Sequence, residues 1–552
     1  MLQAFKEGKS KKLSTNWVYF IDSGGQPAYR ELLPLFTRAA ALNIITIDLT
    51  KGLDEKCKFQ YRISQNTSPI NTNRQYTNRD MICSTISSGA MLSPVKFPYV
   101  TGMPDHPHYL ILGTRKELVD EKNLKEMNES LKEYKANNKV ISYNEDEGSI
   151  IFPVNTLLPA GSKEREEASI QLCTTISNFG VAMTIQLPIQ LFAFEIALQL
   201  KAEKKKRSFL TKEEVTEIGT SLQLDKESDI NEALQYLHNV TIILYYREVD
   251  ILKDLIFVDP KPILDVLSRL IAITYVNHDK LQQIANPPPS IDERKTLKNF
   301  GYFKVDIFKN IGKQIFNKNF NSSHMIALLK HLHIIAEVGE EGNYFFPCAL
   351  PSYDKLCDSP TEIQPLFIAW EIKNGSTTTL AIPQGLFPLT IVHLLEQKDD
   401  KVDFCPDPAD NKMEYYRCHN AMSLRVHQKI YIHIINHYTH IEIRLDKCKK
   451  SCLQIRDLVK EAIESSCKDL NCKDDHIFAF KCPENEKCYC IFQEDDKSTR
   501  CTLPSQCDVL QGDDDSYRCW FIDKLSSPGA ETSESPPSKR SRTVQPTGLL
   551  GE

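Results

Sequence analysis

The sequence lacks any apolar run long enough to cross a membrane. Its 552 residues contain no stretch approaching the roughly 18 apolar residues that a membrane helix needs. The first residues, MLQAFKEGKSKKL, also lack the apolar centre of an export signal. We therefore expect an intracellular, cytoplasmic protein without a membrane span. The basic cluster SKRSR near the end also fits nuclear import, although so short a cluster in a tail usually has no such role.

An excess of either charge is absent as well. The formal net charge is -6 at pH 7, and charged residues make up 25% of the chain, which is close to ordinary globular usage. This balance gives no bias toward polyanions, so nucleic acid is not the expected partner. The 17 cysteines are scattered through a chain without an export signal, so most are expected to be reduced thiols. Twelve of them follow residue 400, and that shift in composition indicates a domain boundary.

A complete phosphate-binding loop is also missing. Such a loop needs G-x-x-x-x-G-K-[ST] between a strand and a helix, because its amides and its lysine neutralise the phosphates. Gly8-Lys9-Ser10 supplies the last three letters, but Gln3 occupies the place of the first glycine and no apolar strand precedes it. We interpret this GKS as a chance match in a lysine-rich segment.

The first part of the chain does contain an α/β pattern. Apolar runs at 17–22, 42–50 and 108–114 alternate with stretches of helical spacing. Alternation of this kind predicts a mainly parallel sheet, which is incomplete here because the strand that would carry a phosphate-binding loop is missing.

The first of these runs ends in the sequence Asp22-Ser-Gly-Gly25-Gln26. The carboxyl end of a strand is where open α/β sheets bind their ligands. At that place Asp22 can reach Mg²⁺ through water, the Gly25 amide can contact a γ-phosphate, and Gln26 can orient the attacking water. The same five residues also fit a glycine-rich turn without chemistry, and the pattern alone leaves both interpretations open.

The longer run DSGGQPAYRELLPLF, followed by a strand and later by LILGTRKEL, resembles the Roc (Ras-of-complex) GTPase domain of Roc-COR proteins. The resemblance implies binding of GTP or GDP with Mg²⁺ and slow GTP hydrolysis, with Gln26 positioning the catalytic water. It also implies that Thr114 and Glu117 serve the guanine base. Glu117 stands where the family usually has Asp, which keeps the carboxylate but adds a methylene.

The middle of the chain shows a tandem repeat. Leu234-x-x-Leu237-His238 leads into two isoleucines, a hairpin and a strand ending in proline, and Leu329-x-x-Leu332-His333 leads into the same pattern. Each copy has the helix, helix, hairpin outline of a winged helix. The helix DINEALQYLHN before the first hairpin carries acidic residues and no Lys or Arg, which favours contact with proteins over contact with DNA.

The phrases ILYYREVDILKDLIFVDPKPILDVLSRLI, NYFFPCALP and IPQGLFPLTIVHLL resemble the COR domain (C-terminal of Roc). The resemblance covers about residues 166–445 and implies a module that transmits nucleotide state and forms homodimers. The histidines of KIYIHIINHYTHIEIRL within it are interpreted as surface residues of a strand pair, in preference to metal ligands.

The end of the chain is rich in cysteine. Residues 453–466 predict an amphipathic helix, and eight of the 17 cysteines follow it. The paired spacing of a zinc knuckle occurs only at Cys448 and Cys452, and Cys488 and Cys490 are expected on opposite faces of a strand. Buried free thiols are therefore the favoured interpretation, no metal ligand is assigned, and zinc binding stays open.

The predicted fold class is multidomain α/β and α+β: a partial Ras-like parallel sheet, a COR domain with tandem winged-helix-like modules and a β-rich half, and a Cys-rich α/β module. The predicted boundaries are 1–165 for the partial Roc domain, 166–350 and 351–445 for the two COR halves, 446–524 for the Cys-rich module and 525–552 for a disordered tail.

The sequence supports a signalling scaffold derived from a GTP-binding protein, with protein partners and nucleotide binding lost or incomplete. Three alternatives stay open: a fragment of an active GTPase whose phosphate-binding loop lies upstream of Met1, a pure interaction protein without nucleotide chemistry, and a zinc-binding adaptor. We expect an upstream start, because the missing strand is central in a Ras-like sheet and its loss leaves amides and carbonyls unpaired.

Overall fold

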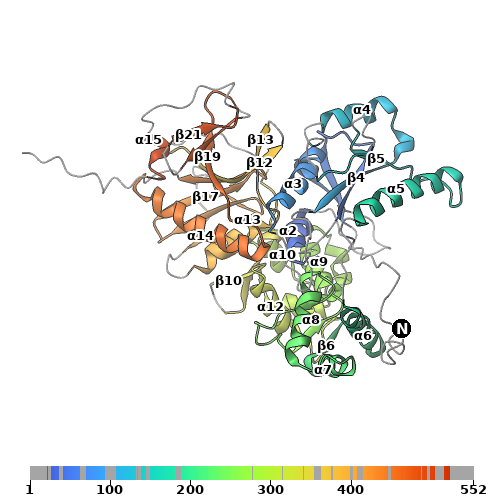
Figure 1. The fold of residues 1–552 in the computed structure, drawn as a ribbon. Helices are drawn as coiled ribbons and strands as arrows, with labels where there is room; N and C mark the ends of the chain where they lie inside the picture. Colours follow the sequence, from blue (N-terminus) through green and yellow to red (C-terminus); the bar gives the residue numbers. More distant parts are fainter. Residues whose placement is uncertain are drawn as a thin grey trace, which may run out of the picture.

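The computed structural model of the chain shows three lobes that meet near one short helix, α2 (Pro27–Phe36), as Figure 1 shows. An α/β lobe, a helical lobe and a lobe built on a large sheet surround it. The residues that the structure describes are 22, 27–36, 42–61, 70–93, 107–131, 134, 139–143, 149–181, 188–276, 278–313, 315–339, 341–353, 362–374, 377–397, 402–406, 415–445, 449–485, 488–493, 498–503 and 515–521.

The α/β lobe contains the parallel sheet that the sequence predicts. Its strands are β1 (Leu42–Asp48), β4 (His108–Thr114) and β5 (Ile151–Pro153), in the order β1-β4-β5 with parallel pairing throughout. The predicted strand at 17–22 lies outside the described residues, apart from its last residue. Within the described part, β1 therefore pairs with β4 alone.

Helices cover both faces of this sheet. Ile82 and Ile86 of α3 (Asn78–Met91) pack with Ile111 on one face, and Leu172 of α5 (Lys163–Val181) packs with Phe152 on the other. The hairpin of β2 (Lys56–Tyr61) and β3 (Ile70–Thr77), the single turn η1 (Lys116–Leu118) and helix α4 (Glu121–Ser130) complete the lobe.

The helical lobe contains the predicted repeat. Two segments have the same element order, helix, strand, helix, helix, strand, strand, and the strand orders β6-β8-β7 and β9-β11-β10 correspond. Their classification as winged helices stays a prediction. The first consists of α6 (Ile189–Lys205), β6 (Phe209–Thr211), α7 (Lys212–Ser221), α8 (Glu227–Asn239), β7 (Leu244–Tyr245) and β8 (Leu255–Phe257).

The second copy follows after α9 (Lys261–Tyr275) and the turn η3 (His278–Gln283). It consists of α10 (Ile291–Phe300), β9 (Tyr302–Lys304), α11 (Val305–Gly312), α12 (Ser322–His331), β10 (Ala336–Glu337) and β11 (Asn343–Phe345), and the turn η4 (Pro347–Ala349) ends it. Local sequence explains several of the helix starts. Thr211 accepts a hydrogen bond from the Glu214 amide and Ser290 one from the Glu293 amide, each within a reciprocal capping box.

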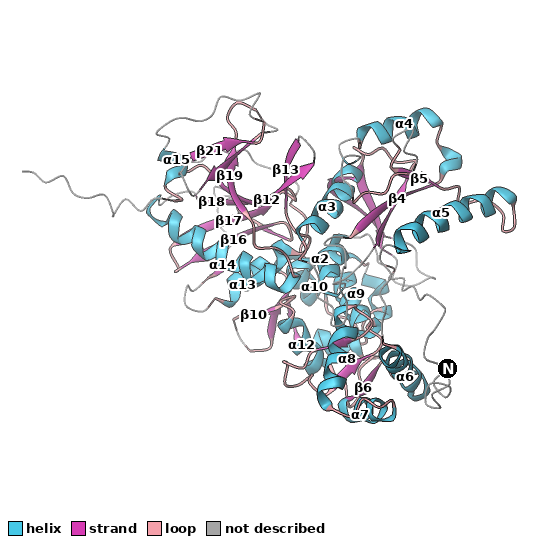
Figure 2. Cartoon of the chain, in the orientation of Figure 1, coloured by secondary structure: helices cyan, strands magenta, loops and turns pink. Residues whose placement is uncertain are grey.

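The third lobe is a ten-stranded antiparallel sheet with two helices beside it, α13 (Leu386–Glu396) and α14 (Cys452–Leu470) (Figure 2). The principal strand order is β14-β16-β17-β18-β12-β19-β20-β21. The strands are β12 (Leu366–Asn374), β13 (Thr377–Ala381), β14 (Asp403–Phe404), β15 (Arg417–Cys418), β16 (Ala421–Val426), β17 (Ile430–Asn436), β18 (Ile441–Leu445), β19 (Ile477–Lys481), β20 (Tyr489–Gln493) and β21 (Ser498–Cys501).

The sheet continues across residue 445, where the sequence suggested a domain boundary. Strand β12 pairs with β18 on one side and with β19 on the other, so strands from before and after that point share one hydrogen-bonded ladder. In the described residues the Cys-rich segment is therefore part of the same sheet as the preceding β-rich half. Composition changes at this point but backbone pairing does not, and the remaining boundaries stay predictions.

The predicted amphipathic helix at 453–466 is confirmed. It is α14, and the five residues expected to face inward, Ile455, Leu458, Val459, Ala462 and Ile463, are all buried. Among the helices that the structure describes, none combines the length and the apolar content that a membrane-spanning segment requires.

Candidate functional site

The carboxyl ends of the parallel strands hold some of the residues predicted to bind nucleotide. Asp22 is exposed to solvent, and Gly25 and Gln26 lie outside the described residues. Thr114 ends β4, and its hydroxyl donates to the Ile47 carbonyl at 3.0 Å. Glu117 is exposed on η1, just after that strand. The structure thus places Thr114 and Glu117 at one edge of the sheet.

Asp48 is a second carboxylate at this edge, which sequence reasoning missed. It ends β1, next to Thr114, and lies 3.3 Å from the Arg115 guanidinium. The Asp48 side chain also accepts hydrogen bonds from the amide and the hydroxyl of Thr50, at 3.0 and 2.7 Å. Arg115 adopts a left-handed conformation with φ of 62°, which turns the chain sharply after β4. Local contacts therefore already engage Asp48 and Arg115.

Helix α2, directly after the segment Asp22–Gln26 that the sequence predicts to bind nucleotide, is the element that joins the lobes. Its apolar residues Leu32, Leu35 and Phe36 are buried in the large core shared by the helical lobe and the sheet lobe, not in the core of the parallel sheet. The helix contacts α14 and η4. A segment that follows a candidate nucleotide-binding loop is thus anchored in the lobes that resemble COR.

A polar contact fixes the register of α2 against α13. The Glu31 carboxylate accepts a hydrogen bond from the Gly385 amide at 2.9 Å, at the N-terminus of α13 where unpaired amides favour negative charge. Burial raises the pKa of Glu31, although the Gly385 amide and the charge of Arg30 act in the opposite direction. The carboxyl is therefore held in a place where its charge is costly.

Gly385 permits this close approach. Its φ is +82°, a left-handed conformation that favours glycine, and a Cβ there would lie 2.6 Å from the Glu31 carbonyl oxygen. Neither Gly385 nor Glu31 was among the site residues predicted from the sequence. The signal in the sequence was the turn Ile382-Pro383-Gln384-Gly385 before an apolar helix, but sequence does not show which backbone approaches that turn.

Helix α3 of the α/β lobe is tied to the same place. Arg30 of α2 donates to the hydroxyls of Ser84 and Thr85 at 3.0 and 2.9 Å. The backbone amide of Gln384 donates to the Ser88 hydroxyl at 2.9 Å. We call the contacts among α2, α3 and the start of α13 the junction. It brings residues about 300 positions apart into one hydrogen-bonded group.

The chain after α14 extends the junction. Ser93 and Asn471 exchange two hydrogen bonds, at 2.8 Å between the Ser93 amide and the Asn471 carbonyl and at 3.1 Å from the Asn471 side chain to the Ser93 carbonyl. The Lys473 amide donates to the Met91 carbonyl at 2.8 Å. The end of α3 is therefore paired with the segment between α14 and β19.

A histidine and carboxylate cluster links the second repeat to the sheet lobe. His333 lies 2.9 Å from Glu396, His393 lies 2.7 Å from Asp469, and the two imidazole centroids are 4.0 Å apart. Burial lowers the pKa of His333, but its hydrogen bond to Glu396 and the charge of Asp469 outweigh that effect and leave the pKa above its usual value. This arrangement supplies proton-dependent contacts between lobes.

The surface interpretation of the histidines of β17 (His433) and of the connection between β17 and β18 (His437 and His440) was wrong. His433 and His440 are buried, and His437 is half-buried beside Glu442. His433 contacts Ser423 of β16 at 2.8 Å, and His440 packs on Phe367 of β12. Alternation in the sequence indicated one buried face, but the last five residues of β17 and all five of β18 are buried, so side chains that point to both faces are buried.

Comparisons with known proteins bear on this arrangement. A family model described as C-terminal of Roc, COR-A domain, matches residues 193–350, which run from within α6 to just after η4 and so include both repeated segments. No curated protein sequence matches the chain.

Among solved structures, one described as Methanosarcina barkeri Roco2 RocCORdC bound to GDP matches 59% of this chain and 93% of that chain, with 13% identity and a TM-score of 0.27. A TM-score of that size does not establish a common arrangement, so no residue role is transferred from it. The family match confirms the Roc-COR resemblance for the segment it covers: this chain carries a COR-A domain at residues 193–350.

Proposed function

We propose that this chain is a Roc-COR-type signalling scaffold that mediates contacts with other proteins, with nucleotide binding lost or incomplete. The observation that supports it best is the burial of α2, the helix after the Asp22–Gln26 loop, in the core of the COR-containing lobes. A change in that loop would act directly on the junction, without an intervening linker. This is what a module that transmits a state from an α/β lobe to COR needs.

The nucleotide roles are part of the proposal and rest on the resemblance. Asp22 and Gly25 would serve Mg²⁺ and phosphate, Gln26 the catalytic water, and Thr114 and Glu117 the guanine base. No phosphate-binding loop occurs in the sequence, and phosphate contacts supply much of a nucleotide's affinity. We therefore expect GTP and GDP to bind weakly or not at all.

Calorimetry of the full chain with GDP and Mg²⁺ tests the nucleotide part. The expected result is no binding at micromolar concentrations. Binding with a micromolar or lower Kd would contradict the proposal and would favour an active GTPase.

Self-association through COR is the second part, and it rests on the family resemblance. Light scattering on the full chain, across a range of concentrations up to tens of micromolar, should give a dimer mass. A strictly monomeric mass over that range would count against a dimeric scaffold.

Protein partners are favoured over nucleic acid by the charge of the first repeat. The first turn of α8, the helix before its hairpin, carries Glu227 and Asp229. Their charges would repel a phosphate backbone. Addition of duplex DNA at low salt should leave the mass measured by light scattering unchanged.

A further inference from the structure

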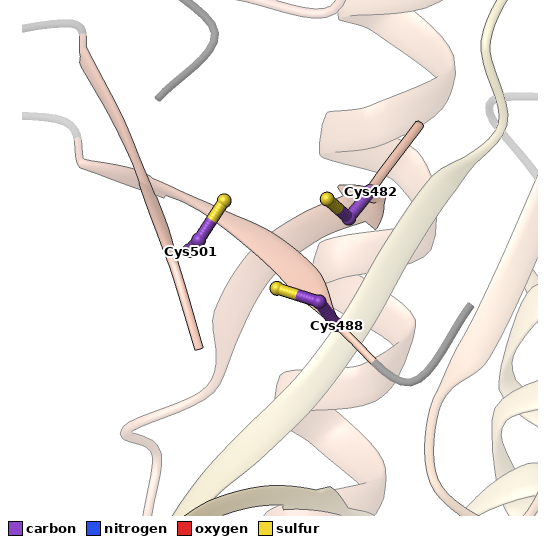
Figure 3. Close-up of side chains that lie close together, drawn as sticks. All are labelled: Cys482, Cys488 and Cys501. Carbon is purple, nitrogen blue, oxygen red and sulfur yellow. The ribbon is translucent and has the colours of Figure 1, made fainter. Parts of the chain in front are cut away.

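Three cysteines from different strand ends of the large sheet converge on one place. Cys482 follows β19, Cys488 precedes β20, and Cys501 ends β21. Their sulfur atoms all lie within 4.8 Å of one another, and all three residues are buried. Figure 3 shows the three thiols pointing toward a common centre. We call these three residues the thiol cluster.

A fourth thiol adjoins the thiol cluster. Cys490 of β20 lies directly opposite Cys501 of β21, and their sulfur atoms are 3.6 Å apart. The expectation that Cys488 and Cys490 face opposite sides of a strand was wrong, because residues two apart on a strand share a face. Both side chains therefore lie on the same side as Cys501.

We propose that the thiol cluster and Cys490 hold one zinc ion in a tetrahedral four-thiolate site. A Zn–S bond of about 2.3 Å places the sulfur atoms of a tetrahedral site about 3.8 Å apart. The thiol cluster reaches this geometry by contracting by about 1 Å or less. Cys490 lies 3.6 Å from Cys501 but outside the set of sulfur atoms within 4.8 Å of one another, so its side chain must shift further to complete the tetrahedron. Soft thiolate ligands in a closed, buried set select zinc among the common divalent ions.

The surroundings include a hydrogen-bond donor to one of these sulfur atoms, although the Cys488 thiol also donates to the Tyr489 carbonyl at 3.7 Å. The Thr502 hydroxyl donates to the Cys488 sulfur at 3.6 Å, which is the outer contact that stabilises a thiolate ligand. A disulfide needs sulfur atoms about 2.05 Å apart, much closer than those of Cys490 and Cys501. As zinc binds, each cysteine forms an S–Zn bond and releases its thiol proton to solvent.

The site would have a structural role that goes beyond the proposed scaffold function. Cys482 and Cys488 flank the turn between β19 and β20, and Cys501 belongs to β21, which is the last strand of the principal order in the described sheet. One ion would therefore close that turn and fasten an edge strand to it. The cysteines come from three strand ends, which explains why paired C-x₂₋₄-C spacing did not reveal them.

Metal analysis of the full chain purified under reducing conditions tests the proposal, with one equivalent of zinc expected. After removal of zinc, titration with Co²⁺ should give the intense sulfur-to-cobalt charge-transfer absorption of a thiolate site, and this readout needs no variant. Absence of both the zinc and the cobalt absorption would overturn the proposal.

Variants then identify the ligands. Cys482→Ser and Cys501→Ser should each weaken cobalt binding by at least about 100-fold. Cys348→Ser, which removes an equally buried thiol far from the site in sequence, should leave cobalt binding unchanged. Cys490→Ser should reduce the charge-transfer intensity, and an unaltered spectrum would overturn its assignment as the fourth ligand. Equal loss in the Cys348 variant would show that the metal site responds to misfolding and not to ligand identity, which would overturn the assignment.

Discussion

At the scale of single residues, Arg417 is the side chain that holds the second repeat against the large sheet. Its guanidinium carbon lies 3.3 Å from the ring centroid of Phe404 and 5.2 Å from that of Phe345. It also donates to the Phe300 carbonyl at 3.1 and 3.3 Å. The residue is buried, so these contacts act in a medium of low dielectric where cation–π attraction is strongest.

Truncation of this side chain should therefore be costly. Arg417→Ala is expected to lower the free energy of unfolding by about 2–4 kcal/mol, because it removes packing, hydrogen bonds and ring contacts together. The control is Arg425→Ala on the neighbouring strand β16. Arg425 forms a more exposed ion pair with Asp403 and should contribute less than about 1 kcal/mol. Equal losses in urea denaturation would contradict this difference.

His440 should make stability depend on pH. Burial, together with the neighbouring His437, lowers the pKa of His440 to about 3, whereas the unfolded chain takes up that proton near pH 6.5. Protons then favour the unfolded chain, so stability is lost as the pH falls below 6.5. From this group alone the expected loss between pH 6.5 and 5.5 is about 1 kcal/mol.

The variant His440→Phe tests this contribution, because it keeps a ring against Phe367 and removes the titrating group. Its stability should fall less steeply over the same interval. Burial raises the pKa of Glu442, but its interactions with His437 and Arg444 outweigh that effect and lower the pKa to about 2. Glu442 therefore changes the stability only below about pH 4.5. Measurements above pH 5 therefore exclude the contribution of Glu442, and the difference between the variant and the wild type separates His440 from other histidines such as His333. An unchanged slope in the variant would refute the role of His440.

At the scale of elements, the start of α13 controls how closely α2 can approach. Gly385→Ala should lower the free energy of unfolding by about 2–4 kcal/mol, since it combines an unfavourable φ with a contact of 2.6 Å to a backbone oxygen that cannot rotate away. Gly161→Ala is the matched control. Gly161 has φ of +80° with nothing within 4 Å, so it should show only the conformational cost of about 1 kcal/mol.

Hydrogen exchange adds a local readout to this pair of variants. Protection of the α2 amides should fall in the Gly385 variant and stay at the wild-type level in the Gly161 variant. Equal stability losses with unchanged α2 protection would show that Gly385 does not position the helix.

The elements differ in how far sequence could predict them. Periodicity predicted α14 and its five inward residues, and the Leu-x-x-Leu-His pattern predicted the repeat, because both depend on spacing along one segment. The pairing of β12 with both β18 and β19 could not be predicted in this way. Apolar spacing in α2 likewise shows that one side is buried but does not identify the covering residues. The thiol cluster depends on the same kind of distant pairing.

At the scale of the whole molecule, the hydrophobic core that a helix joins does not follow from its position in the chain. Helix α2 precedes β1 in the chain, yet its apolar residues share a core with α13, α14 and the second repeat. Helix α3, which follows β1, buries Ile82 and Ile86 in the core of the parallel sheet. The segments that precede and follow β1 in the chain, α2 and α3, therefore both hold the α/β lobe to the rest of the molecule.

Truncating one apolar side chain in each helix should therefore destabilise different lobes. Leu35→Ala and Ile82→Ala both remove a large, buried aliphatic group, with exposures of 2% or less, so each should cost about 2–5 kcal/mol. Hydrogen exchange on the full chain can separate the two effects, because regions open as partly independent cooperative units. Leu35→Ala should lower protection in α14 and around η4, and leave β4 close to wild type. Ile82→Ala should lower protection in β1 and β4 and leave α14 unchanged. If Leu35→Ala instead weakened β4 and spared α14, α2 would belong to the α/β lobe in solution, and coupling through the junction would lose its structural basis.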